Sequence, residues 1–413
     1  MGSALRSGVG VRHTIVTMLR RNFLALSAAS VSFGALAPAK ITRLTIHKFT
    51  LSNRDHLILR VHTDSGIVGL GEGSLPGRID IVEQAIRWLE PHLLGLDPGG
   101  IEDHWNRLYY EASRWRDGSV MNTALAAVDI ALWDIEGKRL GLPVWRLLGA
   151  RRAKPLRVYY SHWSQDVTPR TPAALAELAR RTREAGWTAV KWITFRGGGE
   201  VERLRRIVAE VEAVRQAAPD LDIALELAES FNIRTTIDLA RALVPHRVLF
   251  LEEPTWRESP QGLGEVAAAS PIPIATGEGL VSRYEFRTLL EHKGARILQP
   301  DVIHCGGITE LRRISLLADV YGAEMAPHMW YGPVAHVASL HAMTPCRNFL
   351  MQEWDAVHDE VFAELTHGGY PRQKDGVIAA PDKPGLGIDV DFDLLATPRF
   401  QYRGPSQRPP TGR

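Results

Sequence analysis

The 413-residue sequence contains only two cysteines, Cys305 and Cys346. Two thiols cannot form the disulfide framework of a small secreted domain, so the fold must depend on a hydrophobic core. An excess of charge of one sign is also missing, because 49 Lys and Arg residues against 47 Asp and Glu residues give a net charge of +2. A chain so close to neutral lacks the basic surface that nucleic-acid binding requires, and we expect no nucleic-acid partner.

Acidic residues are absent from the first 37 positions, which contain Arg6, Arg12, Arg20 and Arg21. A paired arginine, a short apolar stretch and the small-residue site Ala35-Leu36-Ala37 are typical of an export signal, and "RRNFL" resembles the twin-arginine signal. The apolar stretch is too short to anchor the chain in a bilayer. We expect residues 1–37 to be an export signal and the remainder to be periplasmic, without membrane contact. If these residues form only an N-terminal helix, the protein is cytoplasmic.

From about Leu156 onward, short apolar runs alternate with amphipathic stretches, which predicts a parallel sheet covered by helices. Six of these runs end in an ionisable residue, at intervals of 23 to 27 residues: Glu226, Glu252, Glu278, Asp301, His328 and Glu353. One carboxylate at such a position would be interpreted as a helix cap. Six ionisable residues at the same place in successive strand–helix units instead favour a common site. A closed barrel brings its strand ends to one point, so we predict a (β/α) barrel over residues 153–379.

Carboxylates that converge at the mouth of a barrel repel one another unless a cation lies among them. Oxygen ligands with positions left open for a substrate suit a hard divalent ion. The pattern therefore predicts a magnesium site among the acidic strand ends.

The N-terminal part has a different pattern. The segments "LTIHKFTLSN", "HLILRVHTDSG" and "IVGLGEG" predict an antiparallel meander with a turn at Asp64-Ser65-Gly66. The segment "NTALAAVDIALWDIEGKRLG" predicts a long helix that Gly141 and Pro143 end. We assign residues 38–152 to an α+β capping domain, which residues from about 380 to 403 complete. Residues 404–413 are expected to be a disordered tail.

Several segments taken together resemble the enolase superfamily: "ALAAVDIALWDIEGKRLGLPVWRLLGA", "LEEP", "TGEG", "LQPDVIHCGGITE", "APHMW" and "QEW". They are similar to its mandelate racemase branch and, within it, to the galactonate dehydratase-like acid-sugar dehydratases. The resemblance covers about Ile41 to Asp391. It implies a modified TIM barrel with an N-terminal capping domain, one Mg²⁺ in each active site, a small sugar-acid substrate and a homo-oligomer.

The resemblance also implies roles for individual residues. Glu226, Glu252 and Glu278 would be the metal ligands. His328 and Asp301 would form a general base–acid pair, in which the carboxylate fixes the tautomer of the imidazole. A proton next to a carboxylate is only weakly acidic, and a divalent cation stabilises the enediolate that its removal leaves.

Two further side chains at this site are implied to meet the substrate carboxylate. Glu353 would donate a hydrogen bond to it when protonated, and Lys191 corresponds to the first lysine of the family's Lys-x-Lys strand. Ile193 stands where the family has the second lysine. Because isoleucine cannot move a proton, we predict that Lys191 holds the carboxylate electrostatically. A base on only one face of the substrate favours dehydration, because racemisation needs an acid and a base on opposite faces.

Two positions depart from the family pattern. Glu226 stands where the first metal ligand is usually aspartate, and Ala228 stands where galactonate dehydratases have the histidine that protonates the leaving hydroxyl. The proton could instead come from any of four residues: His328, Glu229, His162 and Tyr160. His162 and Tyr160 are also candidates for substrate binding. Three arginines near the expected substrate loops could contact substrate oxygens or be solvated: Arg78, Arg114 and Arg116.

The sequence thus predicts a Mg²⁺-dependent hydro-lyase that converts an aldonate or aldarate to a 2-keto-3-deoxy acid. Two alternatives remain open. One is a racemase or epimerase of a 2-hydroxy acid, with Lys191 opposite His328, and the other is a non-catalytic protein that binds or senses a sugar acid. Exchange of the α-hydrogen in D₂O separates the binding protein from both enzymes, and keto-acid formation separates the lyase from the racemase.

Overall fold

The computed structural model describes residues 39–112, 114–116, 118–195 and 197–405. These residues belong to one compact unit, Ala39–Arg413, and the other unit is Met1–Pro38. The predicted export signal, with its four arginines, lies outside the described residues, as do positions 406–413 of the predicted tail. Within the described ranges, no helix combines the length and the apolar composition needed to cross a membrane.

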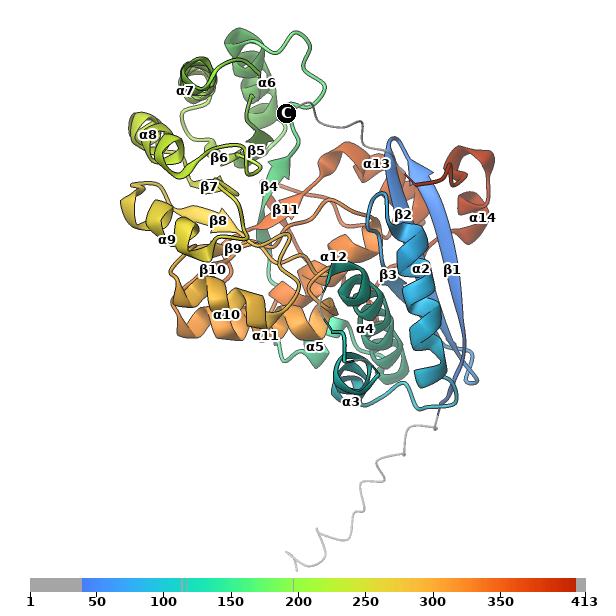
Figure 1. Ribbon diagram of the computed structural model, residues 1–413. Coiled ribbons are helices and arrows are strands. Elements are labelled where there is room, and N and C mark those ends of the chain that lie inside the picture. Colours follow the sequence, from blue (N-terminus) through green and yellow to red (C-terminus); the bar gives the residue numbers. More distant parts are fainter. Residues whose placement is uncertain (1–38, 113, 117, 196, 406–413) are drawn as a thin grey trace, which may run out of the picture. The chain divides into compact units, whose positions relative to one another are not determined.

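The N-terminal part forms an antiparallel sheet of β1 (Ile41–Leu51), β2 (Arg54–Thr63) and β3 (Val68–Glu72), in that order. Helices α2 (Ile79–Leu89), α3 (Ile101–Asn106) and α4 (Ser119–Leu140) follow, and α4 packs against β3 (Figure 1). A Cβ atom at Gly71 would lie 1.9 Å from the carbonyl oxygen of Ala127, so this close approach requires glycine. Helix α4 ends at Gly141, whose φ is +67°. The predicted meander and long helix are confirmed.

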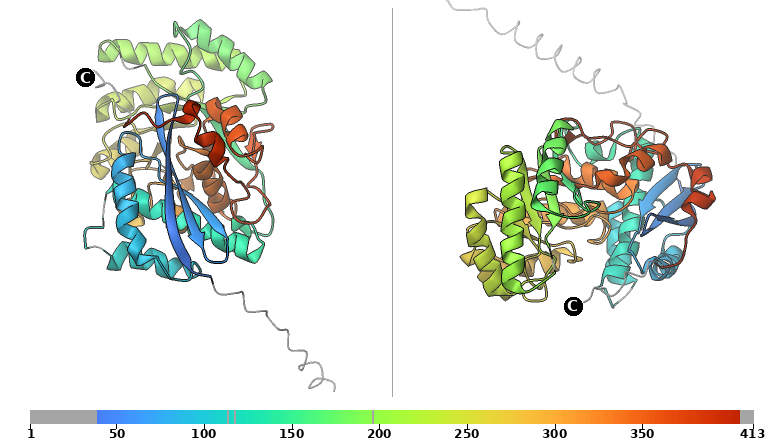
Figure 2. Two further views of the ribbon diagram at one scale, coloured as in Figure 1. Left: turned by 90° about the vertical axis from the view of Figure 1, so that its right-hand side faces the viewer. Right: turned by 90° about the horizontal axis from the view of Figure 1, so that it is seen from above.

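Eight parallel strands follow, each with a helix after it. The strands are β4 (Leu156–Ser161), β5 (Ala189–Ile193), β6 (Asp222–Glu226), β7 (Phe250–Glu252), β8 (Ile274–Thr276), β9 (Ile297–Leu298), β10 (Glu324–Met325) and β11 (Gln352–Trp354). The helices are α6 (Pro172–Glu184), α7 (Glu200–Ala217), α8 (Ile233–Leu243), α9 (Pro260–Ala269), α10 (Arg283–Glu291), α11 (Gly307–Val320), α12 (Pro333–Met343) and α13 (Asp359–Leu365). In the view from above, the green and yellow helices lie outside the barrel strands, on the side away from the blue N-terminal sheet (Figure 2).

The strands are hydrogen-bonded in the order β10-β9-β8-β7-β6-β5-β4-β11. A parallel bridge between Met325 of β10 and Phe349, just before β11, closes the ring. The predicted (β/α) barrel with a capping domain is therefore confirmed.

Alternation along the strands decides which side chains reach the barrel interior. In β5, Val190 and Trp192 face outward and pack on the helices, whereas Ala189 faces inward. Lys191 and Ile193 consequently point to the C-terminal mouth, where both line a cavity. The lysine in this apolar strand is thus directed to the end of the barrel where active sites of this fold lie.

The last part of the chain returns to the N-terminal sheet. Strand β12 (Val377–Ile378) pairs with β4, and α14 (Phe392–Leu395) follows. Gln401 forms an antiparallel bridge with Phe49 of β1, and the Tyr402 hydroxyl donates to Asp80 of α2 over 3.0 Å. Short helices complete the description: η1 (Glu90–His92), η2 (Arg107–Glu111), α5 (Val144–Leu147), η3 (Val244–His246), η4 (Ala356–His358) and η5 (Pro398–Phe400).

A carboxylate of the N-terminal sheet caps a barrel helix. Glu72, at the end of β3, accepts hydrogen bonds from the backbone N–H groups of Gly332 (2.7 Å) and Ala335 (2.9 Å), which begin α12. A negative charge there satisfies backbone donors that have no partner within the helix. The loop between β10 and α12, which carries His328, is therefore held from outside the barrel.

Candidate active site

The three predicted metal ligands converge at the mouth of the barrel. Glu226 and Glu252 end β6 and β7, and Glu278 follows β8 by two residues. One carboxylate oxygen from each lies within 4.8 Å of the other two. Burial raises the pKa of Glu226, and the charge of Glu252 raises it further; burial also raises the pKa of Glu278. The negative charges of these three carboxylates repel one another. A hard divalent cation, which prefers oxygen ligands, would offset that repulsion.

Lys191 meets three carboxylates. Its ammonium nitrogen lies 2.5 Å from Oε1 of Glu252, 3.0 Å from Oε1 of Glu353 and 3.9 Å from Oε2 of Glu226. Burial favours the neutral amine, but the charges of Glu252 and Glu353 outweigh it and raise the pKa of Lys191 well above its usual value. A lysine so firmly protonated can hold a negative group, but it has no lone pair with which to remove a proton.

Glu353 accepts hydrogen bonds in this structure, which differs from the protonated donor that the resemblance implied. Its Oε1 accepts from Ser161 Oγ at 2.5 Å, and its Oε2 accepts from the backbone N–H of Met329 at 2.9 Å. Burial disfavours the charge, yet Lys191 and His328 hold the pKa of Glu353 at about 2. Both oxygens are thus occupied by donors, and the ionised form is the stable one.

His328 and Asp301 form the predicted pair. Asp301 follows β9 by three residues, and its Oδ2 lies 2.6 Å from Nδ1 of His328, while Oδ1 accepts from the backbone N–H of Ile303 at 2.8 Å. The carboxylate therefore fixes a proton on Nδ1 and leaves Nε2, which lies 3.4 Å from Oε2 of Glu278. Burial opposes protonation, but Glu278, Glu353 and Asp301 together raise the pKa of His328 to about 10.

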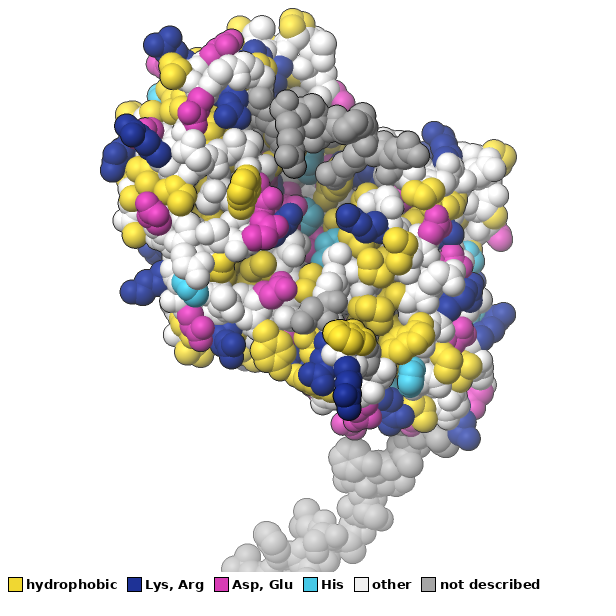
Figure 3. Space-filling view, in the orientation of Figure 1, with side chains coloured by type: hydrophobic (Ala, Val, Ile, Leu, Met, Phe, Trp, Pro, Cys, Tyr) yellow, Lys and Arg dark blue, Asp and Glu magenta, His cyan; other side chains and the backbone are white. Residues whose placement is uncertain are grey.

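These side chains surround one cavity of about 350 Å³. Figure 3 shows acidic and histidine side chains gathered in a hollow at the centre of the molecular face. The lining residues are Ser161, His162, Gln165, Lys191, Trp192, Ile193, Glu226, Ala228, Glu253, Glu278, His328, Trp330 and Glu353. The volume suits a small organic acid.

Other predicted residues lie elsewhere. Tyr160 faces out of the barrel and stacks on Trp187, with ring centroids 4.9 Å apart. Glu229 turns to Arg257, whose backbone N–H it accepts at 3.1 Å. Of the four candidate acids, only His162 and His328 line the cavity. Three arginines predicted as weak substrate contacts are exposed and do not line it: Arg78, Arg114 and Arg116.

Five cavity residues escaped the sequence analysis: Ser161, Gln165, Trp192, Glu253 and Trp330. Glu253 directly follows the predicted metal ligand Glu252, and burial with the charge of Glu278 raises its pKa to about 9. Trp330 follows His328 by two residues in the same loop. This short spacing was the sequence signal from which its place at the cavity could have been predicted. Arg54 of β2 stacks its guanidinium 4.1 Å from the centre of the Trp330 ring and donates to the Trp330 carbonyl over 3.3 Å. No sequence signal links Arg54 to that ring.

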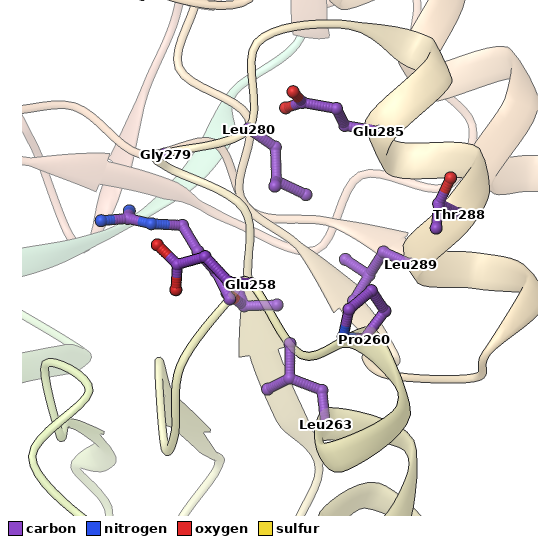
Figure 4. A pocket seen from close by; sticks show the side chains of 10 residues that line it. Glu258, Pro260, Leu263, Gly279, Leu280, Glu285, Thr288 and Leu289 are labelled. Atoms are coloured by element: carbon purple, nitrogen blue, oxygen red, sulfur yellow. The ribbon is translucent and has the colours of Figure 1, made fainter.

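A second cavity, of about 380 Å³, lies between α9 and α10 (Figure 4). Leucine and proline side chains form much of its wall, and Glu285 at its edge accepts from the backbone N–H of Val281 at 2.8 Å. None of the residues predicted for the site lines this second cavity. Gly279, which does line it, directly follows Glu278 in the chain. The chemistry is concentrated in the first cavity.

A capped barrel with three converging carboxylates and an Asp–His pair at its strand ends is typical of an enolase-type active site. Residues 30–149 match the mandelate racemase/muconate lactonizing enzyme N-terminal domain, and residues 174–394 match the enolase C-terminal domain-like family. The chain therefore belongs to the mandelate racemase/muconate lactonizing enzyme family of the enolase superfamily.

Named relatives and solved structures agree with this assignment. A D-galactonate dehydratase of Variovorax paradoxus is 38% identical over 370 residues, which cover 86% of this chain and 93% of the relative. A D-galactonate dehydratase of Cronobacter sakazakii is 36% identical with the same coverage. The crystal structure of a mandelate racemase/muconate lactonizing enzyme from a Jannaschia species has a TM-score of 0.79 at 34% identity, covering 86% of this chain and 96% of that one.

Proposed function

We propose that this protein is a hydro-lyase that removes water from a sugar acid, of the aldonate or aldarate type, to form a 2-keto-3-deoxy acid with Mg²⁺ as its cofactor. The observation that carries the proposal is that His328, paired with Asp301, faces the cavity while Ile193 stands where the family has its second lysine base. The relatives named D-galactonate dehydratase, at 36–38% identity, support the same reaction class.

In this proposal each residue of the site has a task. In its neutral form His328 takes the C2 proton of the substrate at Nε2, because Nδ1 is committed to Asp301. A cation held by Glu278 would offset the negative charge that raises the pKa of His328. Lys191 holds the substrate carboxylate, and Glu226, Glu252 and Glu278 would hold the cation. A bound Mg²⁺ supplies positive charge that offsets the charge developing on that carboxylate.

Loss of the C3 hydroxyl completes the reaction. The C2–H electron pair forms the new C2–C3 double bond, the C3–O bond breaks, and a proton must reach the departing oxygen. His328 can return the proton that it has just removed, which gives a syn elimination and leaves the histidine neutral again. The enol product then tautomerises to the 2-keto-3-deoxy acid. A racemase would need a second base, and Ile193, which stands where the family has its second lysine, cannot move a proton.

The test is a panel of aldonates and aldarates incubated with the purified protein and Mg²⁺, with 2-keto acids detected by semicarbazone absorbance. At least one acid should yield a keto acid, and excess chelator should abolish the yield. Exchange of the C2 hydrogen in D₂O is followed by NMR in the same samples. Exchange with inversion at C2 and no keto acid would contradict the proposal in favour of a racemase. Binding with neither exchange nor keto acid would contradict it in favour of a binding protein.

A further inference from the structure

A short relay of hydrogen bonds connects Glu353 to the wall of the cavity. Ser161, the last residue of β4, is fully buried, and its Oγ lies 2.5 Å from Oε1 of Glu353. The same Oγ lies 3.0 Å from Nδ1 of the next residue, His162. Both ends of the relay, Glu353 and His162, line the cavity.

The directions of these two hydrogen bonds follow from the donors around Glu353. Lys191 and the backbone N–H of Met329 point at its two oxygens, so the carboxylate is ionised and can only accept. Ser161 has one hydroxyl proton, which it must donate to Glu353. Its oxygen is then left as the acceptor for His162, and the imidazole has to carry its proton on Nδ1.

The surroundings of His162 keep its other nitrogen available. The ring stacks on Trp330, with centroids 5.5 Å apart and 26° between the planes. The backbone is held at a φ of +55°, a left-handed conformation in which histidine is enriched among non-glycine residues. Burial lowers the pKa of His162 to about 4, so the ring is neutral at physiological pH. Among the described residues, none is hydrogen-bonded to Nε2, which is therefore an unprotonated acceptor at the cavity wall.

We propose that His162 determines substrate specificity, because its Nε2 accepts a hydrogen bond from one hydroxyl group of the substrate chain, with Ser161 as the positioning residue that fixes the tautomer. This inference rests on the proposed function, since it assumes a polyhydroxylated acid in the cavity. An acceptor without a proton recognises a hydroxyl donor, and it is left unpaired when that hydroxyl is missing.

The first experiment measures binding, which requires no turnover. Dissociation constants are determined by calorimetry, with Mg²⁺ present, for a sugar acid and its series of single-deoxy analogues. The wild-type protein should bind the analogue that lacks the recognised hydroxyl about tenfold more weakly. His162→Phe keeps a ring for the stack on Trp330 but removes the acceptor, so this one preference should disappear. The control His367→Phe, at an exposed histidine outside the cavity, should keep it.

The second experiment reads the tautomer. Nitrogen NMR of histidine-labelled protein, with the His162 signals assigned by their loss in His162→Phe, should show a protonated Nδ1 and an unprotonated Nε2. Ser161→Ala removes the acceptor of Nδ1–H, and the ring should shift toward the Nε2–H form. A protonated Nε2 in the wild-type protein, or a deoxy preference that survives His162→Phe, would overturn the inference. Failure of keto-acid formation with the binding preference intact would instead count against the proposed lyase.

Discussion

The ammonium nitrogen of Lys191 lies 2.5 Å from Oε1 of Glu252, so the lysine and a predicted metal ligand form one buried unit. The second oxygen of Glu252 accepts a hydrogen bond from the side-chain amide of Gln299. A carboxylate held at both oxygens has little freedom to reorient, and it presents a fixed negative charge to a cation. Changes at Lys191 and at Glu252 should therefore not have independent effects.

Replacing Glu252 with glutamine should weaken the binding of divalent cations by about 10- to 100-fold and remove most of the activity. The substitution keeps the shape of the side chain but deletes one of three converging charges. Mg²⁺ and Mn²⁺ affinities are measured by calorimetry, and circular dichroism checks the fold. Glu258→Gln is the matched control, because Glu258 is exposed and outside the carboxylate cluster. Equal cation affinity in the two variants would refute this metal site.

The variants Lys191→Arg and His328→Asn should distinguish the residue that holds the substrate carboxylate from the residue that removes the C2 proton. The guanidinium of Lys191→Arg keeps the charge but misplaces it, because it is planar and larger than an ammonium, so turnover should fall while C2–H exchange in D₂O remains detectable. His328→Asn should abolish exchange, since the described cavity offers no other base on that face. The measurement is NMR of a sugar acid that the wild-type protein converts. The opposite pattern, with exchange lost only in Lys191→Arg, would reverse the two roles.

Arg54 and Asp355 form a buried ion pair that Arg54→Gln should break. The pair joins β2 to the end of β11, and the two side chains are 5% and 0% exposed. Removing one partner leaves a buried charge without compensation, which costs about 3–5 kcal/mol of unfolding free energy. Urea unfolding measures the loss, and the double variant Arg54→Gln/Asp355→Asn should lose less than the sum of the single variants. Strict additivity would show that the pair is not coupled.

His341 should make the protein sensitive to mild acid. Its Nδ1 accepts from the backbone N–H of Trp145 at 3.1 Å, its Nε2 donates to the carbonyl of Leu386 at 2.9 Å, and burial lowers its pKa to about 4. Because the unfolded pKa is near 6.5, the unfolded chain takes up the proton first. The stabilisation is complete above pH 6.5 and falls as the pH decreases to 4, by roughly 3 kcal/mol in all.

The check on His341 is the unfolding free energy of His341→Gln at pH 7 and pH 4.5. The difference between the two pH values should shrink relative to the wild-type protein, although His336, whose pKa burial also lowers to about 4, should keep part of it. His367→Gln, at an exposed histidine, should leave the difference unchanged. A pH dependence that His341→Gln does not alter would contradict the prediction.

Export can be tested on the segment that precedes the described residues. We propose that residues 1–37 direct the protein to the periplasm, and the double substitution Arg20→Lys and Arg21→Lys should then retain it in the cytoplasm with this segment attached. Cell fractionation and the mass of the intact protein provide the measurement. Unchanged periplasmic recovery would reject the twin-arginine interpretation.

The barrel and its acidic ring could be predicted because both depend on a local, repeated pattern. Each strand–helix unit places its last polar residue at the same height, so the interval of 23 to 27 residues determines the convergence of Glu226, Glu252 and Glu278. Tyr160 and His162 show where that reasoning ends. Tyr160 lies within β4 and faces outward by strand alternation, while His162 follows the strand in a left-handed conformation that no local pattern indicated.

Contacts between distant segments could not be predicted from the sequence. Arg54 reaches Trp330 across 276 positions, and Ser161 reaches Glu353 across 192. Such contacts depend on how the sheet packs against the barrel and on the closure of the ring, which a local pattern does not encode. The same limit applies to Arg78, because it lies in a loop and the sequence did not indicate the direction of its side chain.

The bridge between Phe49 and Gln401 has a consequence for the order in which the molecule is made. About 350 residues separate the two ends of this bridge, and a ribosome needs roughly 20 to 70 seconds to add them. Strand β1 is among the first parts of the described chain to be synthesised, and β2 follows it at once, but the bridge partner Gln401 arrives only with the last described residues. The outer edge of β1 at Phe49 therefore lacks this partner until Gln401 has been added, and truncation before Gln401 should expose the part of the sheet that was made first.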